Sequence, residues 1–210
     1  MRAPILALAL ALAAPALAEG DQPGEFDYYV LALSWSPSWC EIEGDAREAD
    51  QCNPGSGYGW ILHGLWPQYE DGWPSDCRTT ERDPNRRMTR DMADIMGSSG
   101  LAWHQWKKHG RCAGLPAARY FDLSRQAYEA VARPDVFRRL PDPVEIRPDV
   151  IEEAFIAANP GLSPSHMTVS CRDGHIVELR VCLTKGLAPR DCTGPAARSC
   201  GRAATLLPLD

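Results

Sequence analysis

The sequence has few of the features that mark membrane, repeat or nucleotide-binding proteins. After residue 18, the 210-residue chain has no apolar run near the roughly 18 to 20 residues of a membrane-spanning helix. It has no internal repeat and no low-complexity tract. The glycines at positions 55, 57 and 59 lack the strand-to-helix context of a phosphate-binding loop. We therefore expect no membrane anchor beyond residue 18 and no glycine-rich nucleotide site.

The sequence also lacks the excess of positive charge that a tight nucleic-acid binder usually carries. Arg2 is one of 22 basic residues, so without residues 1–18 there are 21 basic residues against 28 acidic ones, a formal charge of −7. An enzyme that releases polyanionic products needs only a local basic patch, and Lys107, Lys108 and Arg111 form one. A second basic cluster is more typical of a solvated surface than of a substrate groove: Arg82, Arg86, Arg87 and Arg90.

The first residues have the pattern of a secretory signal. A charged start at Arg2 precedes an apolar run over 5–17, and Ala16-Leu17-Ala18 is a small-residue cleavage site. We expect cleavage before Glu19, which leaves one exported domain over 19–210 in a periplasm or outside the cell. The alternative is that the segment remains as an uncleaved anchor.

The cysteines agree with export. All eight follow the expected signal, and an even number in a chain bound for an oxidising compartment predicts four disulfides. Spacing alone leaves the pairing open. No two cysteines have the two-residue gap that is typical of structural zinc sites, which disfavours zinc binding. They are Cys40, Cys52, Cys77, Cys112, Cys171, Cys182, Cys192 and Cys200.

Three of the five histidines lie in two short segments beside tryptophans and a lysine. The segments are His63-Gly64-Leu65-Trp66-Pro67 and Trp103-His104-Gln105-Trp106-Lys107-Lys108-His109-Gly110-Arg111-Cys112. Histidine acts as acid or base near neutral pH because its unperturbed pKa is roughly 6.5. Two imidazoles suffice to cleave RNA: one takes the proton of the 2'-hydroxyl, and the other gives a proton to the departing 5'-oxygen.

The groups around these histidines fit single-stranded nucleic acid. Lys108 and His104 are placed to stabilise charge that develops on the phosphate oxygens. The rings of Trp66, Tyr69 and Trp73 are suited to base stacking, which is worth on the order of 1 to 3 kcal/mol per base and tolerates sequence. The pattern predicts an acid/base site that needs no metal or other cofactor.

A zinc site in the second segment is less consistent with the spacing. His104 and His109 are five residues apart, which is roughly 140° around a helix, whereas helical zinc ligands are four apart. Lys108 instead shares the helix face of His104. His166 and His175 match no motif, and we interpret them as packing residues.

Together the two segments resemble the paired signature motifs of the ribonuclease T2 family, in particular its bacterial secreted or periplasmic type. The resemblance implies that His63 and His109 are the catalytic pair, with His109 as the base and His63 as the acid in the first step. It implies that Lys108 and His104 hold the phosphate. It also implies base contacts near Trp66, Gln68 and Trp73.

Gln105 departs from the family motif, which most often has glutamate at this position. An amide cannot transfer a proton, but it can donate or accept a hydrogen bond at the phosphate, so we keep Gln105 among the catalytic-site residues. The missing carboxylate would have held the nearby imidazole protonated. We therefore predict a lower pKa for His109 than in a glutamate-bearing relative.

The resemblance also implies a disulfide pattern. It suggests that Cys77–Cys112 ties the two active-site segments together and that Cys171–Cys200 and Cys182–Cys192 form near the end of the chain. It leaves Cys40–Cys52 as the fourth pair.

Strand and helix patterns alternate irregularly, which favours an α+β fold over a doubly wound sheet. The family resemblance likewise implies a central antiparallel sheet flanked by helices. We predict strands over 26–35, 58–67, 167–171 and 175–184, and helices over 88–96, the second motif, 117–132 and 149–158. Segments 36–59 and 71–85 and the tail from 186 are expected as loops. Alternation in the first motif predicts two faces, with Ile61, His63 and Leu65 on one and Trp60, Leu62 and Trp66 on the other.

These observations predict an exported endoribonuclease that cleaves single-stranded RNA by transphosphorylation through a 2',3'-cyclic phosphate. DNA, which lacks the nucleophilic 2'-hydroxyl, should not be cut. Because one histidine must be charged and the other neutral, we expect a bell-shaped, acid-shifted pH profile. Two alternatives are a catalytically weak homologue that serves as an RNA-binding or toxin-like module, and a secreted metal-dependent hydrolase.

Overall fold

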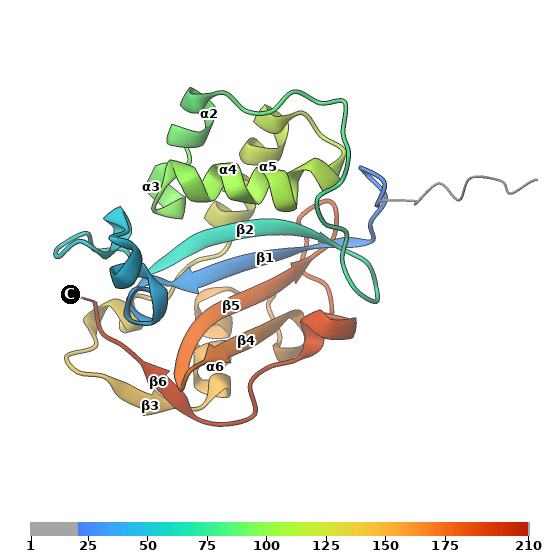
Figure 1. The fold of residues 1–210 in the computed structure, drawn as a ribbon. Coiled ribbons are helices and arrows are strands. Elements are labelled where there is room, and N and C mark those ends of the chain that lie inside the picture. The colour runs from blue at the N-terminus through green and yellow to red at the C-terminus, as the bar shows by residue number, and fades with distance from the viewer. Residues whose placement is uncertain (1–20, 210) are drawn as a thin grey trace, which may run out of the picture.

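The computed structural model describes residues 21–209, which form an α+β domain around a six-stranded sheet (Figure 1). The expected signal segment lies outside these residues. The strand order is β2-β1-β5-β6-β3, with β4 paired to β5. All pairs are antiparallel except β5 with β6, which meet in one parallel pair, His175–Thr205. The strands are β1 (Tyr28–Trp35), β2 (Trp60–Gln68), β3 (Val144–Ile146), β4 (Met167–Arg172), β5 (His175–Leu183) and β6 (Ala204–Leu206).

Six α-helices accompany the sheet in the described part of the chain. Helices α2 to α5 lie together beside β2, whereas α6 lies at the other end of the sheet near β4 (Figure 1). Within residues 21–209, every helix is too short or too polar to cross a membrane. The helices are α1 (Ser36–Trp39), α2 (Arg86–Arg90), α3 (Ala93–Met96), α4 (Ser99–Lys108), α5 (Ala117–Ala130) and α6 (Pro148–Ala158).

The two faces of the sheet carry different residues. Alternate side chains of β1, among them Leu31 and Leu33, enter a large core with side chains of α4, α5 and α6. The intervening residues Tyr28 and Val30 join a small second cluster with Cys182. This alternation follows from the two-residue period of a strand. The second face therefore carries only a small apolar cluster.

Four disulfides close the chain, and each pairing implied by the family resemblance is confirmed. Cys77–Cys112 joins the segment that follows β2 to the turn that follows α4. The others are Cys40–Cys52, Cys171–Cys200 and Cys182–Cys192.

The prediction of one helix over 88–96 is wrong, because two helices occupy this region. Asn85 caps α2 by accepting from the amides of Arg87 and Met88. The carbonyl of Asp91 then accepts a 2.7 Å hydrogen bond from the Arg125 guanidinium of α5, and the helix is interrupted there. A tertiary contact therefore lies at the break in a pattern that looks continuous in the sequence.

Short elements were also missed. The segment 36–59, expected as a loop, contains α1 and several single helical turns, and the tail contains β6 and the turn Gly194–Ala197. Strand β3 pairs with β6 across about sixty residues of sequence. Three-residue strands have no detectable periodicity of their own, so only their distant partners reveal them.

Candidate active site

A β-bulge in β2 places the first motif. Ala32 of β1 pairs with Gly64 and Leu33 pairs with Leu62, so His63 has no partner in the register. An extra residue in one strand reverses the alternation beyond it. Leu62 and Leu65 therefore both enter the large core, although strict alternation predicts opposite faces.

The same bulge corrects the prediction for Trp66. His63 and Trp66 were expected on opposite faces, but both line one cleft, and their ring centroids are 5.1 Å apart. Gly64 between them has no room for a side chain. A Cβ there would lie 2.3 Å from Trp66 Nε1 and 2.4 Å from Gln105 Oε1. Glycine is thus required by the close approach of the two motifs.

Helix α4 carries most of the second motif and ends at Lys108, beside the predicted catalytic residue His109. Ser98 caps the helix by accepting from the Leu101 amide at 3.1 Å. His109 follows the last helical residue, with φ −123° and ψ −42°, so it leaves the helical path. The predicted angle of about 140° between His104 and His109 therefore does not apply. Gly110 allows this turn, because a Cβ there would lie 2.7 Å from the Trp106 ring.

The loop before α2 fastens this helix end. Asp83 accepts hydrogen bonds from Trp106 Nε1 at 2.8 Å and from Arg111 Nη2 at 2.8 Å. The amide of Asp76 donates to the carbonyl of Lys108 at 2.8 Å. These contacts were not predicted from the sequence, since polar residues in a loop carry no signal that distinguishes such a clamp from a solvated surface.

One cleft of about 330 Å³ is lined by all eight residues that the two motifs and the family resemblance assigned to catalysis or base binding. Tyr69, whose ring was also expected to suit base stacking, does not line it. Residues of β2, of α4 and of the segments that follow them meet here, although the two motifs are about forty positions apart. The eight residues are His63, Trp66, Gln68, Trp73, His104, Gln105, Lys108 and His109.

Trp66 lies at the centre of the cleft residues. Its ring stacks on His109 with a centroid distance of 5.1 Å and an interplanar angle of 28°, and it meets His63 edge-on. Its Nε1 donates to Gln105 Oε1 at 2.7 Å. Gln105 is buried, so its amide oxygen is committed to the indole. Gln105 thus fixes the Trp66 ring, and both histidines lie against that ring.

Burial controls the protonation of His109. Its side chain is 6 % exposed, and desolvation, with smaller contributions from Lys108, His63 and His104, lowers its pKa to about 3. Its Nδ1 is buried without a hydrogen-bond partner in the described residues, so no acceptor there favours a second ring proton. His109 is therefore neutral over most of the pH range, as a general base must be.

His104 and Lys108 lie on the exposed side of α4 at the same cleft. Partial burial and then the charge of Lys108 lower the pKa of His104. Lys108 supplies a positive charge at the cleft wall. The two residues share a helix face as their spacing predicted.

A model of the ribonuclease T2 family matches residues 26–192, which is most of the chain. The chain belongs to this family.

Individual relatives agree with this membership. A ribonuclease of Aeromonas hydrophila is 44 % identical over 103 residues, 49 % of this chain and 45 % of the relative. A probable ribonuclease of Haemophilus influenzae is 32 % identical over 121 residues, 52 % of this chain and 44 % of the relative. The match thus spans less than half the length of either curated relative.

Solved structures show the same fold. Trichomaglin, described as an S-like ribonuclease, superposes with a TM-score of 0.66 and 24 % identity over 87 % of this chain and 98 % of its own. RNase NT in complex with 5'-AMP superposes with a TM-score of 0.61 and 23 % identity, over 86 % of this chain and 97 % of its own.

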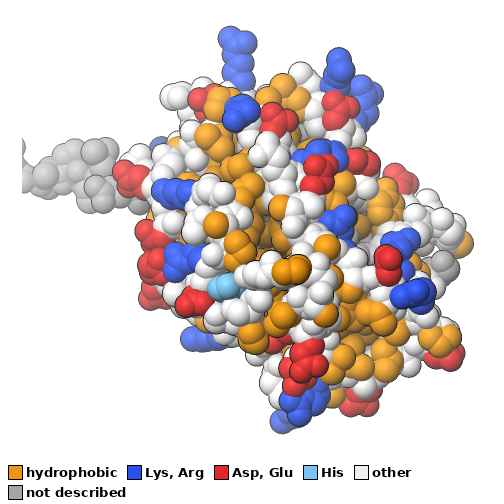
Figure 2. Space-filling view, turned by 180° about the vertical axis from the view of Figure 1, so that it is seen from behind, with side chains coloured by type: hydrophobic (Ala, Val, Ile, Leu, Met, Phe, Trp, Pro, Cys, Tyr) orange, Lys and Arg blue, Asp and Glu red, His pale blue; other side chains and the backbone are white. Residues whose placement is uncertain are grey.

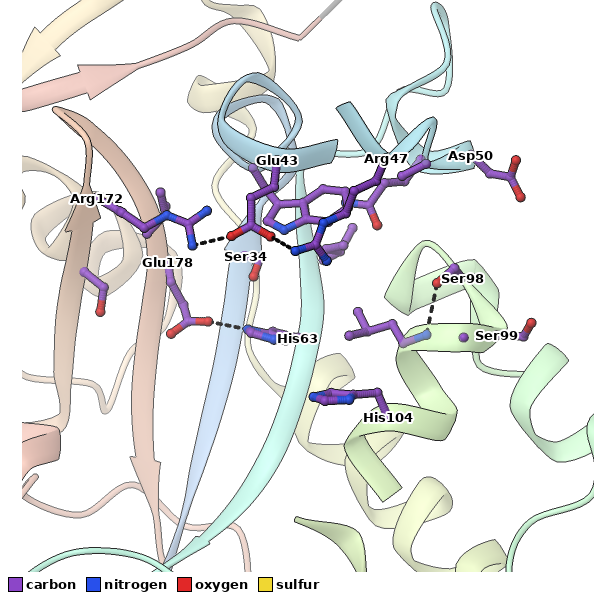
Figure 3. A pocket seen from close by; sticks show the side chains of 18 of the residues that line it. Ser34, Glu43, Arg47, Asp50, His63, Ser98, Ser99, His104, Arg172 and Glu178 are labelled. Atoms are coloured by element: carbon purple, nitrogen blue, oxygen red, sulfur yellow. Dashed lines mark hydrogen bonds and ion pairs between the residues drawn. The ribbon is translucent and has the colours of Figure 1, made fainter. Parts of the chain in front are cut away.

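Two further charged residues belong to this site and were not predicted from the sequence: Arg180 lines the cleft, and Glu178 lines a neighbouring groove that also contains His63. Glu178 and Arg180 lie two positions apart on β5 and point to the same face of the sheet. Glu178 Oε2 lies 2.6 Å from His63 Nδ1, and Arg180 Nε donates to Glu178 Oε1 at 2.6 Å. Figure 3 shows Glu178 reaching His63 from β5, across β1, which lies between β5 and β2 in the sheet. Charged residues at alternate positions of an otherwise apolar strand were the available signal.

The residues expected to contact bases differ in their exposure and in the contacts that they already make. Trp73 is 52 % exposed at the cleft, so its ring is available for stacking. Gln68 is buried, and its amide donates to the carbonyl of Pro67 at 2.9 Å. The Trp66 ring is already in contact with both catalytic-motif histidines.

The remaining basic residues and histidines do not enter the cleft. The four arginines of the second basic cluster are exposed, and none of them lines it. On the face seen in Figure 2, basic and acidic side chains of the described chain are interspersed. His166 Nδ1 accepts from the Ser163 amide at 3.2 Å and so stabilises a turn.

Proposed function

We propose that this protein is an exported endoribonuclease that cleaves single-stranded RNA by transphosphorylation. One observation carries the proposal: His63 and His109 flank one indole in a cleft with a lysine, and their environments differ. His109 is buried and held neutral, whereas His63 faces a buried carboxylate. Two groups whose environments separate their protonation states are suited to act as base and acid.

In the first step, neutral His109 takes the proton of the 2'-hydroxyl, and the 2'-oxygen attacks the neighbouring phosphorus. The bond from phosphorus to the 5'-oxygen breaks, and His63 in its protonated form gives that oxygen a proton. The products are a 2',3'-cyclic phosphate and a free 5'-hydroxyl. Lys108 and His104 support the negative charge on the phosphorane oxygens.

In a slower second step the roles reverse. His63, now neutral, takes a proton from water, which attacks the cyclic phosphate. His109 returns its proton to the departing 2'-oxygen, and both histidines regain their starting states. No metal is required by either step.

The surroundings of the cleft support a single-stranded substrate. A groove of about 1070 Å³ continues from it and shares His63, His104 and Arg180 with it. The open cleft and the longer groove give room for a chain rather than one nucleotide. Trp73 offers a flat face for one base.

Export is proposed on two grounds. The pattern of residues 1–18 is that of a secretory signal. The four disulfides of the described chain are typical of proteins that fold in an oxidising compartment.

The deciding experiment is digestion of single-stranded RNA by the purified protein with EDTA, at pH 5 and pH 8, with analysis of the product ends. We expect cleavage that leaves cyclic phosphates, loss of cleavage in His63→Ala and in His109→Ala, and retention in the control His166→Gln. DNA of the same sequence should stay intact.

Other outcomes identify the alternatives. Cleavage that EDTA abolishes would indicate a metal-dependent hydrolase. Binding of RNA without cleavage, by a protein whose fold and disulfides are confirmed, would indicate a binding module in which Gln105 has disabled the site.

A further inference from the structure

Glu178 is a buried carboxylate whose contacts are made to cleft residues. It is 5 % exposed on β5, where it pairs in register with Ser34 of β1. One of its oxygens meets His63 Nδ1 and the other accepts from Arg180 Nε, each at 2.6 Å. His63 and Arg180 both line the cleft.

Such a group is costly to bury. Burial raises the pKa of Glu178, but the hydrogen bonds and charges of His63 and Arg180 together outweigh it, so the pKa is held below its usual value. The carboxylate is therefore ionised near neutral pH. A buried charge needs partners that satisfy it, and here both partners are cleft residues.

We propose that Glu178 is a positioning residue for His63: it holds the proton on Nδ1 and turns Nε2 toward the reacting phosphate. This inference rests on the proposed ribonuclease function. Glu178 on β5 thus places a carboxylate beside His63. The second motif supplies no carboxylate, because it has Gln105 where the family most often has glutamate.

The contacts of Glu178 with His63 and Arg180 require two hydrogen-bond acceptors, one for each partner. His63 Nδ1–H and Arg180 Nε–H are both donors, and only a carboxylate offers each of them an oxygen. In Glu178→Gln the single amide oxygen is claimed by the guanidinium, which never loses its charge. The amide NH2 then faces His63 Nδ1, which must become an acceptor, and the ring proton moves to Nε2.

That change opposes the acid role of His63. An imidazolium carries protons on both nitrogens. Its Nδ1–H and the amide NH2 of the variant would then be two hydrogen-bond donors facing each other, with no acceptor between them. Other charges near His63 are unchanged: Arg180 on β5, His104 and Lys108 on α4, and His109 after it. The same holds for the charged residues that share the larger groove with His63, which are Glu43, Arg47, Glu48, Asp50 and Arg172. The effect therefore comes from the lost carboxylate oxygen and its charge.

The test compares the natural protein with Glu178→Gln, which has nearly the same shape. We expect kcat to fall on the order of 10² to 10⁴-fold, with KM within about twofold because Glu178 is almost fully buried and offers little surface to a substrate. The alkaline limb of the pH–rate profile should move to lower pH, because the imidazolium has lost its counter-charge. Glu152→Gln is the control, since Glu152 also bonds a side chain, Ser199 Oγ at 3.0 Å, outside the cleft.

A second measurement does not depend on activity. NMR of the ring nitrogens should show His63 of the natural protein, above neutral pH, as the Nδ1–H tautomer, and Glu178→Gln as the Nε2–H tautomer. An Nε2–H tautomer in the natural protein would overturn the inference, even if the variant does not fold. So would an unchanged kcat in a folded variant. Failure of the natural protein to cleave RNA would instead refute the proposed function.

Discussion

At the scale of single residues, the site depends on how each histidine is surrounded rather than on histidine alone. His109 is enclosed by Trp66 and by the end of α4, and burial lowers its pKa to about 3. His63 is partly open and faces Glu178. In the proposed mechanism, these two environments suit one histidine to act as the base and the other as the acid.

Gln105→Glu tests how the amide contributes to this difference. The new carboxylate can still accept from Trp66 Nε1, and its charge favours protonated His109. We expect a higher pKa for His109 in an NMR titration. Because the proposed mechanism requires neutral His109, the acid limb of the kcat/KM profile should move to higher pH.

Gln126→Glu is the matched control for this variant, since it adds the same charge on the exposed side of α5. An unchanged His109 pKa in Gln105→Glu would show that burial alone controls the base.

At the scale of elements, the site is the meeting of an irregular strand with the end of a helix. The bulge at His63 turns two motif residues to one face of β2. The end of α4 releases His109 from the helical path, and Asp83 holds that end through Trp106 and Arg111. A regular β2 would have placed His63 and Trp66 on opposite faces, and a continued α4 would have kept His109 on the helical path.

Asp83→Ala tests the clamp on α4. The variant leaves the fully buried Trp106 N–H without an acceptor, which costs about 1 to 3 kcal/mol. The partly exposed ion pair with Arg111 adds at most about 1 kcal/mol. We expect this loss in the free energy of unfolding, measured by urea denaturation at pH 7.

The clamp should also depend on pH. Hydrogen bonds from Arg111 and then Trp106 lower the pKa of Asp83, so its stabilisation is present above the unfolded carboxyl pKa of about 4 and is lost as pH falls. The difference between the natural protein and Asp83→Ala should shrink below that pH. The control is Asp122→Ala, an exposed ion-pair residue of α5, and an equal loss in both would contradict the clamp.

At the scale of the whole molecule, disulfides join segments that the sheet alone does not hold. Cys77–Cys112 links residues 35 positions apart and closes the loop that carries Asp83. Cys182–Cys192 links residues only 10 positions apart. In the chain-entropy model a longer closed loop gives more stability, because the unfolded chain loses more freedom.

The double variant Cys77→Ser with Cys112→Ser is expected to lose about 4 kcal/mol of unfolding free energy. Its kcat should also fall, because the turn that follows His109 is no longer fastened. Urea denaturation and RNA cleavage measure the two effects. Loss of less than about 1 kcal/mol would contradict the loop-closure argument.

The sequence predicted the larger elements and the cleft residues well, for local physical reasons. The motif of α4 has its cap, its charged residues and its terminating glycine within one stretch of chain. The hairpin of β4 and β5 has its turn between its strands. Where residues close in sequence make the contacts that stabilise an element, the sequence pattern is sufficient to predict that element.

By itself, then, the sequence determined the chemistry available to this protein: two histidines, a lysine and aromatic rings in two motifs, in a disulfide-closed α+β domain. The tertiary structure decided how these groups face one another. The bulge at His63 depends on the register with β1. The carboxylate of Glu178 is 115 positions from His63 in the chain and 2.6 Å from it in space. Such pairings arise when distant strands meet, and no local pattern encodes them.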